Sequence, residues 1–407
     1  MKQIKKELDE MLELGIIEES HSSWSSPIIL VDKPDGTFRF VVDYRKVNNV
    51  SEIDAFPLPR IDDLIDRIGN AKYITKFDIS KAYWQVNLTE KSKEISAFTT
   101  PWGIYNFKVL PFGLASAPST FQRLMEKVLS RLEEFAGTYL DDITIYSFEW
   151  KEHLNHIERV LQRIKAAGLT MKMSKCEFAT AVIEYLGHTV GEGQVKPNRR
   201  KIQAVIDFPR PKDRKQMRQF LGIANFYRKF IPHMAHISSA LNDLLKKGTK
   251  FTWTDAQENA FLQIKSYLCT DPILKAPDFN KDFSIACDAS EVAVAGVLFQ
   301  QHGELMHPTC YFSRKLNKHQ CNYSVIEREC FGLLLSVRVF SVYFNGNPIR
   351  VLTDHNPLKY LKQMANHNRK LLRWSLELQQ YNLVIEHLPG KQNILPDILS
   401  RPTTSEV

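Results

Sequence analysis

Two adjacent carboxylates, Asp141 and Asp142, interrupt an otherwise apolar and β-branched stretch between Phe135 and Tyr146. This pattern predicts two short strands joined by a tight turn at the acids. Like charges on one turn are costly to hold together unless a cation lies near them. Mg²⁺ prefers such oxygen ligands, and substrate phosphates usually complete its shell. The ordinary alternative is a solvated Asp-Asp turn, which only the rest of the chain can exclude.

A third carboxylate is expected to complete this site. The pattern from Tyr73 to Ile79 predicts a strand that ends at Asp78, and an aromatic side chain, Tyr83, follows five residues later. Phosphoryl transfer assisted by two metal ions needs acids from at least two chain segments, because one hairpin cannot surround two cations. Asp78 is therefore the natural third ligand beside the Asp-Asp pair.

A second acidic set lies in the last third of the chain. Asp288 and Asp354 each end a strand pattern, and Glu329 lies on a predicted helix with Glu327 close by. Asp397 lies where another helix should begin. Four carboxylates gathered at one end of a sheet could form a second two-metal site.

Length and composition exclude several other classes of protein. A chain of 407 residues is too long for one core, so two to four domains are expected. With 43% hydrophobic and 25% charged residues, the composition is that of a soluble globular protein. No apolar stretch reaches membrane-spanning length, and no apolar signal core follows the charged start. We therefore expect neither a membrane partner nor secretion.

The cysteines and histidines do not predict a structural metal site. Six scattered cysteines without a CxxC motif indicate reduced thiols in an intracellular compartment. Metal-ligand types are dense between His302 and Cys330, but no pair has the spacing of a closed zinc site. We interpret these residues as part of a sheet or its surface.

The positive charge is concentrated in one segment. The net charge is +8, yet fourteen Lys or Arg between Lys196 and Lys250 accompany only three Asp, a local excess of eleven. A basic stripe of this kind predicts a polyanionic partner, most often nucleic acid. A predicted hairpin near the N-terminus also carries Lys33, Arg39 and Arg45, which either face an anion or are ordinary exposed charges.

The remaining pattern supplies the elements that must position these residues. It predicts a helix within residues 1–20 that ends at Gly15, and a helix over 153–167 that ends at Gly168. Further helices are predicted over 117–125 and 217–230, a short hairpin over 183–190 and a linker near 270–281.

These motifs together make the sequence recognisable. It resembles the reverse transcriptase–RNase H region of the Pol polyprotein of Ty3/gypsy-type LTR retrotransposons, over nearly the whole chain. Many ordered motifs matching together are far more specific than any one of them. The motifs are Leu14–Glu18 with Ser26–Ile28, Arg39–Arg45, Phe77–Ile79 with Tyr83 and Gln85, Leu110–Leu114, Tyr139–Asp142, Tyr185–His188, Phe220–Gly222 with Tyr227 and Arg228, Thr353–His355, and Asp397–Arg401.

The resemblance implies the fold class and the domains. The fold would be α/β and α+β multidomain, a right-hand polymerase of fingers, palm and thumb followed by an RNase H-like mixed-sheet α/β domain. Fingers and palm would cover residues 1–195, the thumb 196–275 and the RNase H-like domain 280–402. The distance from Asp141 to Asp288 leaves little room for the extra connection domain of retroviral enzymes.

The resemblance also implies catalytic and metal-binding roles for seven acids. Each set would hold two Mg²⁺, for which Mn²⁺ can substitute. His387 resembles a mobile catalytic residue of this branch, and Pro396 before Asp397 departs from the small residue that relatives usually carry. A misplaced fourth carboxylate would lower RNase H activity. The acids are Asp78, Asp141 and Asp142 for the polymerase, and Asp288, Glu329, Asp354 and Asp397 for RNase H.

Substrate contacts are implied in the same way. Lys33 and Arg39 would hold the incoming triphosphate, and Tyr83 would exclude a 2′-OH under the sugar. Phe112 occupies a pocket position at which retroviral relatives carry Gln, and Gln85 belongs to the same deoxynucleotide pocket. Nucleic acid would contact a primer grip and the thumb, through Leu186, Gly187, His188, Arg218, Tyr227 and Arg228.

The expected function is an RNA-directed and DNA-directed DNA polymerase with a linked RNase H. Its partners would be an RNA template, a DNA primer, an RNA–DNA hybrid and deoxynucleotides, and a homodimer is compatible with the resemblance. Its location would be intracellular, in cytoplasmic particles or in the nucleus.

Two alternatives stay open. The first is a domesticated or decayed element retained for nucleic-acid binding, although the presence of all seven acids favours activity. The second is a viral RNA-copying polymerase. An attached RNase H argues against it, because such an enzyme makes no hybrid to degrade.

Overall fold

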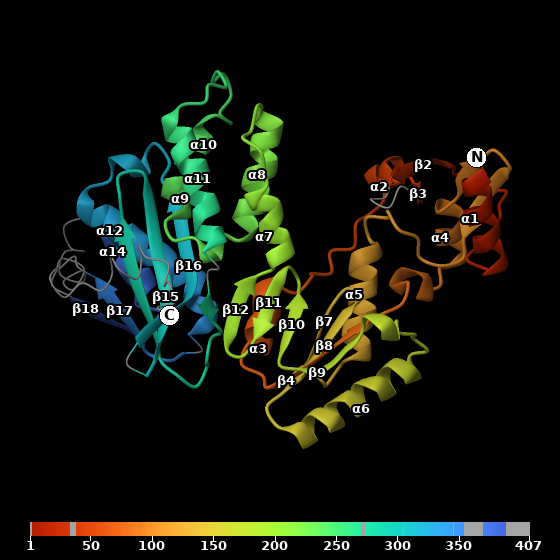
Figure 1. Ribbon diagram of the computed structural model, residues 1–407, viewed down its shortest axis with the longest axis horizontal. Coiled ribbons are helices and arrows are strands. Elements are labelled where there is room, and N and C mark those ends of the chain that lie inside the picture. The colour runs from red at the N-terminus through yellow and green to blue at the C-terminus, as the bar shows by residue number, and fades with distance from the viewer. Residues whose placement is uncertain are drawn as a thin grey trace. The chain divides into compact units, whose positions relative to one another are not determined.

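The computed structural model describes residues 2–32, 38–270, 273–303, 305–344, 346–353 and 369–387. The chain forms two compact units, one of residues 1–64 and 71–183 and the other of residues 65–70 and 184–407 (Figure 1). No helix among the described residues is both long and apolar enough to cross a membrane. All six cysteines lie in the described ranges, and none of them is in a disulfide.

The first unit begins with a five-stranded sheet. Its order is β1 (Ile17–Glu19), β6 (Gly103–Phe107), β5 (Phe98–Thr100), β2 (Ser26–Asp32) and β3 (Phe38–Val42), with β2 parallel to β5 and the other pairs antiparallel. The helices of this part are α1 (Lys2–Glu13), α2 (Arg45–Val50) and α4 (Glu90–Ile95). As predicted, α1 is amphipathic: it buries Ile4, Leu8 and Met11 and ends before Gly15, whose φ is +66°.

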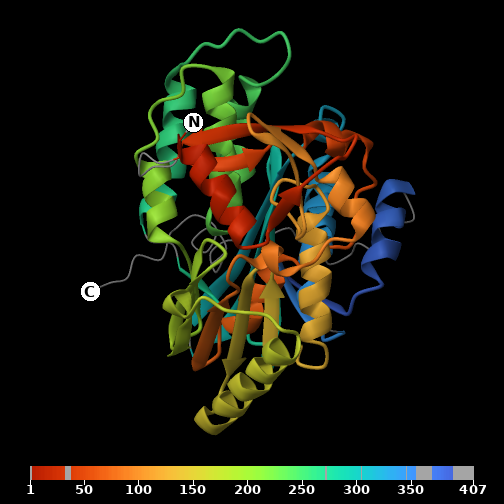
Figure 2. The same ribbon diagram turned by 90° about the vertical axis from the view of Figure 1, so that its right-hand side faces the viewer.

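A second sheet in this unit carries the acids near Tyr139. Its order is β7 (Ala136–Tyr139), β8 (Asp142–Ser147), β4 (Tyr73–Asp78) and β9 (Glu177–Thr180), all antiparallel. The helices α5 (Ala117–Val128) and α6 (Trp150–Ala166) pack against it (Figure 2). The strands β4 and β8 are rich in apolar residues because they share a core with these helices. This core includes Phe77, Phe121, Met125, Ile143, Ile145 and Val160.

The helix α3 (Ile61–Ile68) leads from the first unit into residues 65–70, which belong to the second. Gly69 and Asn70 tie this segment in place. The Gly69 carbonyl accepts from Gly193 N at 2.9 Å, and Asn70 Nδ2 donates to Pro277 O at 2.7 Å. A Cβ at Gly69 would lie 2.4 Å from the Ala276 side chain, so this close approach requires glycine.

The second unit contains a small sheet followed by a helical segment. The sheet order is β10 (Val182–Tyr185), β11 (His188–Gly191), β12 (Gln194–Pro197) and β13 (Leu274–Lys275). The helices are α7 (Arg199–Ile206), α8 (Arg214–Phe226), α9 (Met234–Ile237), α10 (Ser239–Asp243) and α11 (Asp255–Cys269).

The boundaries of α8 differ from the predicted helix over 217–230. The helix begins earlier because Asp213 caps it, accepting from Gln216 N at 2.8 Å. It ends at Phe226, and Arg228–Phe230 form a separate 3₁₀ turn. Met217, Phe220 and Leu221 are buried, so the apolar face packs inside while Arg218 stays exposed.

The last sheet is mixed, as predicted. Its order is β16 (Leu305–Lys315), β15 (Ala293–His302), β14 (Phe283–Ala289), β17 (Ile349–Thr353) and β18 (Leu383–His387), with β14, β17 and β18 parallel to one another. The helices α12 (Val325–Phe340) and α14 (Arg369–Leu378) share its core. A Cβ at Gly296 would lie 2.3 Å from Ser336 Oγ, which shows how closely α12 approaches β15.

Two candidate active sites

Backbone pairing brings the first three acids together. Asp78 ends β4, Asp142 begins β8, and these residues lie opposite one another in the antiparallel ladder. Asp141 lies in the turn between β7 and β8, and its carbonyl accepts a hydrogen bond from Ile79 N at 3.0 Å. The predicted trio is thus assembled from two chain segments.

The turn itself is strained and braced from α5. Leu140 has a φ of +55°, a left-handed conformation that non-glycine residues rarely adopt. The buried Gln122 side chain accepts from Leu140 N at 2.8 Å and donates to Thr138 O at 3.2 Å. Sequence reasoning missed Gln122, because no pattern reveals that a helical Gln faces a turn eighteen residues later.

The electrostatics of the trio disfavour the charged form of Asp142, and two nearby lysines offset this effect only in part. Burial raises the pKa of Asp142 to about 6, and the charges of Asp141 and Asp78 act in the same direction. Lys76 and Lys175 oppose this shift. A carboxyl with a pKa raised in this way gains from a nearby cation, and three carboxylates are suitable ligands for Mg²⁺.

A lysine already contacts one of these acids. Lys175 Nζ lies 3.1 Å from Asp78 Oδ2. Within the described ranges, no three His, Cys, Asp or Glu side chains are arranged so that they could hold a metal ion in this conformation. The three acids have the donor chemistry of a divalent-cation site but not its arrangement in this conformation, in which Lys175 is the counter-charge of Asp78.

An aromatic group lies beside the acids. Tyr83 belongs to the 3₁₀ turn Ala82–Gln85; burial, and then the charge of Asp141, raise its pKa. Its ring centroid lies 5.1 Å from that of Phe112 and 5.7 Å from that of Phe121. Phe112 is 54% exposed, so the predicted pocket residues Tyr83 and Phe112 form one surface near Asp141.

Of the other predicted pocket residues, only Gln85 has a described side chain. Gln85 Oε1 accepts from Thr170 N at 2.7 Å, and its Nε2 donates to Thr170 O at 3.0 Å and to Ser80 O. Through these bonds the Gln85 side chain links the backbone at Ser80 to the backbone at Thr170. Lys33 lies outside the described residues, and so does the side chain of Arg39, whose backbone is part of β3.

The predicted primer grip is a tight turn between β10 and β11. Leu186 and Gly187 have φ values of +45° and +83°. Tyr227 Oη donates to Gly187 O at 2.8 Å, and His188 packs among aromatic rings, with its centroid 5.7 Å from that of Tyr227. Tyr227 is 1% and His188 2% exposed, so in this conformation neither offers surface to a duplex, and both support the turn.

The two predicted arginine contacts also differ. Arg218 is exposed on α8 and available to an anion. Arg228 donates a hydrogen bond through Nη2 to Ser313 O on β16, so it joins the helical segment to the last sheet.

The second acidic set is seen in part. Asp288 is exposed near the end of β14, and Glu329 is 8% exposed on α12. One turn after Glu329, a Cβ at Gly332 would lie 3.6 Å from Asp288 O, so α12 lies against the end of β14. Glu327 instead caps its own helix through Ser324 and lies 3.1 Å from Lys370 Nζ.

The remaining predicted RNase H residues fall at or beyond the limits of the described residues. Asp354 and Asp397 lie outside them. His387 ends β18 opposite Thr353, but its side chain is outside the described part. Near Asp288 the structure adds two residues that the sequence did not suggest, His233 and His236.

Two family models match this chain. Residues 31–190 match the reverse transcriptase (RNA-dependent DNA polymerase) family, and residues 278–381 match the RNase H-like domain found in reverse transcriptase.

Curated relatives cover nearly all of the chain. The retrovirus-related Pol polyproteins from transposons 297 and 412 of Drosophila melanogaster are 38% and 36% identical over 98% and 100% of it. The transposon Tf2-3 polyprotein of Schizosaccharomyces pombe is 36% identical over 98%. The chain spans 38%, 34% and 30% of the lengths of these three relatives, in that order.

Solved structures share the fold. The foamy viral protease-reverse transcriptase in complex with dsDNA has a TM-score of 0.83 at 21% identity, covering 95% of this chain and 82% of that one. The same viral protein in complex with RNA/DNA hybrid has a TM-score of 0.80 at 22% identity, covering 100% of this chain and 55% of that one. The predicted fold class, a polymerase followed by an RNase H-like domain, is confirmed.

Proposed function

Because the chain belongs to the reverse transcriptase–RNase H region of Ty3/gypsy-type retrotransposon Pol polyproteins, we propose that it makes DNA on RNA and DNA templates. We propose further that it degrades the RNA strand of RNA–DNA hybrids. Its substrates would be an RNA template, a DNA primer, deoxynucleotides and the hybrid that synthesis produces.

The polymerase proposal rests on one observation, the convergence of Asp78, Asp141 and Asp142 at the ends of β4 and β8. Asp78 and Asp141 would hold two Mg²⁺ or Mn²⁺ ions, which lower the pKa of the primer 3′-OH and neutralise charge on the leaving pyrophosphate. Asp142 would shape the hairpin and its field.

Other side chains would bind the substrates of this reaction. Tyr83 and Phe112 would support the sugar and base, and Lys33 and Arg39 would hold the triphosphate. The helical segment 196–275 would track the duplex as a thumb, with Arg218 on its exposed face and the Leu186–Gly187 turn near the primer.

The RNase H proposal rests on Asp288 and Glu329, which lie on β14 and α12, two elements that pack against one another near the end of β14. Asp354 and Asp397 would complete the ligand set, and His387 would assist. Two Mg²⁺ ions would activate the attacking water. The sugar 2′-OH and the groove shape would select the RNA strand. Base identity would not contribute to this selection.

Primer extension on poly(rA)/oligo(dT) with Mg²⁺ tests the polymerase. We expect extension by the wild type and none by Asp141→Asn, with Asp282→Asn as an exposed carboxylate control that stays active. Duplex binding without extension by the wild type would contradict the proposal and favour a retained nucleic-acid-binding protein.

A labelled RNA–DNA hybrid tests the nuclease. The wild type should cut the RNA strand, and Asp354→Asn should spare it. Equal cutting by both proteins would refute the assignment of Asp354.

A further inference from the structure

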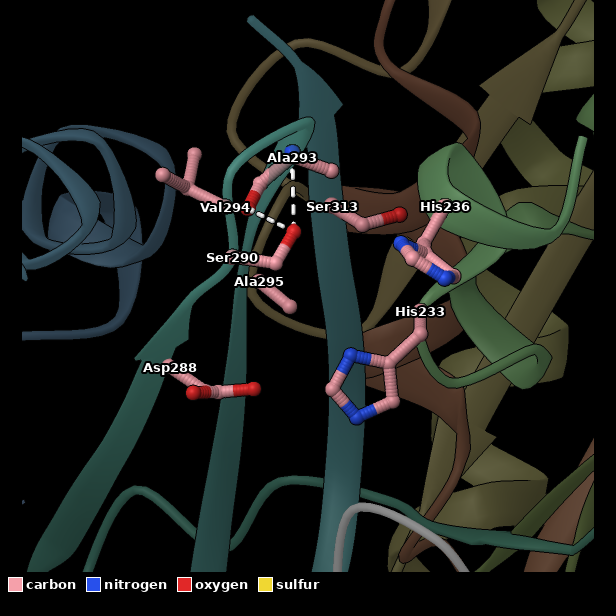
Figure 3. Close-up of a pocket in the computed structure, with 8 residues that line it drawn as sticks. All are labelled: His233, His236, Asp288, Ser290, Ala293, Val294, Ala295 and Ser313. Carbon is pink, nitrogen blue, oxygen red and sulfur yellow. Dashed lines mark hydrogen bonds between the residues drawn. The ribbon is translucent and has the colours of Figure 1, made fainter. Parts of the chain in front are cut away.

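A pocket of about 180 Å³ lies beside Asp288 in the second unit. Its walls come from two places far apart in the sequence, the segment at α9 and the strands β14, β15 and β16. Figure 3 shows the Asp288 carboxylate and the His233 ring pointing into the same space from these different elements. The lining residues are His233, His236, Asp288, Ser290, Ala293, Val294, Ala295 and Ser313.

The backbone around His233 is held in an uncommon conformation. His233 has a φ of +50° and a ψ of +27°, in the left-handed region. Its carbonyl accepts from His236 N at 2.9 Å and from Ile237 N at 3.1 Å. Strain of this kind persists only where the surroundings fix it, and it is often found at functional sites.

Ser313 fixes the segment to β16. This residue is 3% exposed; its Oγ accepts from Ala235 N at 2.9 Å, and its carbonyl accepts from Arg228. Lys315 Nζ adds an ion pair with Asp243 at 2.9 Å, two residues further along the same strand. The two histidines are therefore held at a set position relative to β16, which belongs to the same sheet as Asp288 and is separated from its strand β14 by β15.

The chemistry of the pocket differs on its two sides. Asp288 supplies a carboxylate, and the histidines supply ring nitrogens. A histidine ring carries at least one N–H donor in either protonation state, and His236, which also lines the pocket, is exposed.

We propose that His233 and His236 form a phosphate-contact subsite for the strand whose scissile bond reaches Asp288. This inference rests on the proposed RNase H function. Successive phosphates of one strand are close together, with a rise of about 3.4 Å per nucleotide, so a neighbour of the scissile phosphate must lie near Asp288. N–H donors suit a phosphodiester oxygen, whereas a further carboxylate would repel it.

The subsite would position the substrate without reading its sequence, since phosphate contacts carry no base information. It would also make a segment outside the RNase H-like domain part of the nuclease site. His233 and His236 are thus positioning residues, and their substitution should act on substrate affinity more than on the rate of the saturated enzyme.

Isosteric pairs that differ in charge provide the test. His233→Asn and His233→Asp both tolerate a positive φ, and His236→Gln and His236→Glu have the same shape. For a labelled RNA–DNA hybrid of about ten base pairs, His233→Asp and His236→Glu should raise KM about five- to tenfold. The neutral variants should raise it less than threefold, and kcat should stay within about twofold.

His319 supplies a matched control. It is exposed in the same unit and away from the pocket lining. If His319→Glu raises KM as much as His236→Glu, the effect is one of net charge and the subsite is refuted. A fall in kcat at constant KM would also overturn the positioning role, and thermal unfolding excludes a misfolded variant.

Hybrid binding without divalent ions separates the two proposals. The dissociation constants of the same variants, measured by fluorescence anisotropy in EDTA, should follow the KM series. If the wild type does not cut the hybrid, the proposed RNase H function fails, and the binding series still decides the subsite. Equal dissociation constants for all variants would refute it.

Discussion

The two acidic sites are built by different means. At the first, Asp78 and Asp142 face one another across a continuous antiparallel ladder, and Asp141 is one residue away in the hairpin turn. At the second, Asp288 comes from a strand and Glu329 from a helix packed against it. A ladder sets side-chain positions through backbone hydrogen bonds, whereas a strand–helix site depends on how closely the two elements pack.

The charged and polar neighbours of the two sites also differ. Lysines at positions 76 and 175 counter the negative field of the first site. A histidine at position 233 faces the acid of the second. Lysines therefore offset the acids of the first site in part, whereas an imidazole faces the acid of the second. Lys175 and His233 both come from segments remote in the sequence from the acids they face.

The largest expected effect is the separate loss of each activity. Asp141→Asn should reduce primer extension by about 10³-fold, because the variant loses a charge where the reaction needs it, and should leave hybrid cutting unchanged. Asp288→Asn should do the reverse. Both assays on both proteins check this; joint loss in either variant would show that the two sites are not independent.

The pH dependence of stability should reveal two opposing groups in the first unit. His153 is buried between Thr75 on β4 and Ser147 on β8, with bonds of 2.8 and 2.9 Å. Burial lowers its pKa from 6.5 to about 4. Its neutral form therefore stabilises the unit above pH 6.5, and this contribution is lost as the pH falls towards 4.

Asp142 acts in the opposite sense. Burial raises its pKa from 3.8 to about 6, so its contribution is present below pH 3.8 and is lost as the pH rises through 6. Each group accounts for at most about 3 kcal/mol, so the two nearly cancel between pH 4 and 6 in the wild type.

Removing one of these two groups should reveal the pH dependence of stability that the other contributes. Asp142→Asn should lose stability as the pH falls from 6.5 to 4, and His153→Gln should gain it. Urea unfolding in EDTA, followed by tryptophan fluorescence, measures both slopes. Parallel slopes in the two variants would contradict the assigned pKa shifts.

A smaller effect is expected at the brace of the turn. Gln122→Ala leaves Leu140 N and Thr138 O without their partner and should lower the free energy of unfolding by about 2 kcal/mol. Primer extension should fall with it, and hybrid cutting should not. Gln162→Ala, an exposed helical glutamine, is the control, and equal losses in both would show that the brace is unimportant.

The smallest effect is expected at Lys175. Its side chain is 57% exposed, so the ion pair with Asp78 contributes at most about 1 kcal/mol to stability. Lys175→Ala should instead lower the Mg²⁺ concentration for half-maximal extension about twofold, because a competing cation is removed from Asp78. Lys172→Ala tests whether any nearby exposed lysine has this effect.

Much of the fold was predictable because its signals are local. The strand before Asp78, the hairpin at Asp141 and the amphipathic helix α1 all follow from patterns within about fifteen residues. Boundaries were less accurate: α6 begins at Trp150 instead of residue 153, and α8 ends at Phe226, because caps and turns decide where a helix starts and stops.

The sequence by itself determined the strands and the helix that carry Asp78, Asp142, Asp288 and Glu329, since each of these elements has a periodic pattern of its own. Only the tertiary structure decided their neighbours. Gln122 at the turn, Lys175 at Asp78 and His233 at Asp288 come from elements distant in the chain. Periodicity tells which face of an element is buried, but it does not tell what that face will touch, and the electrostatic balance of both sites depends on those contacts.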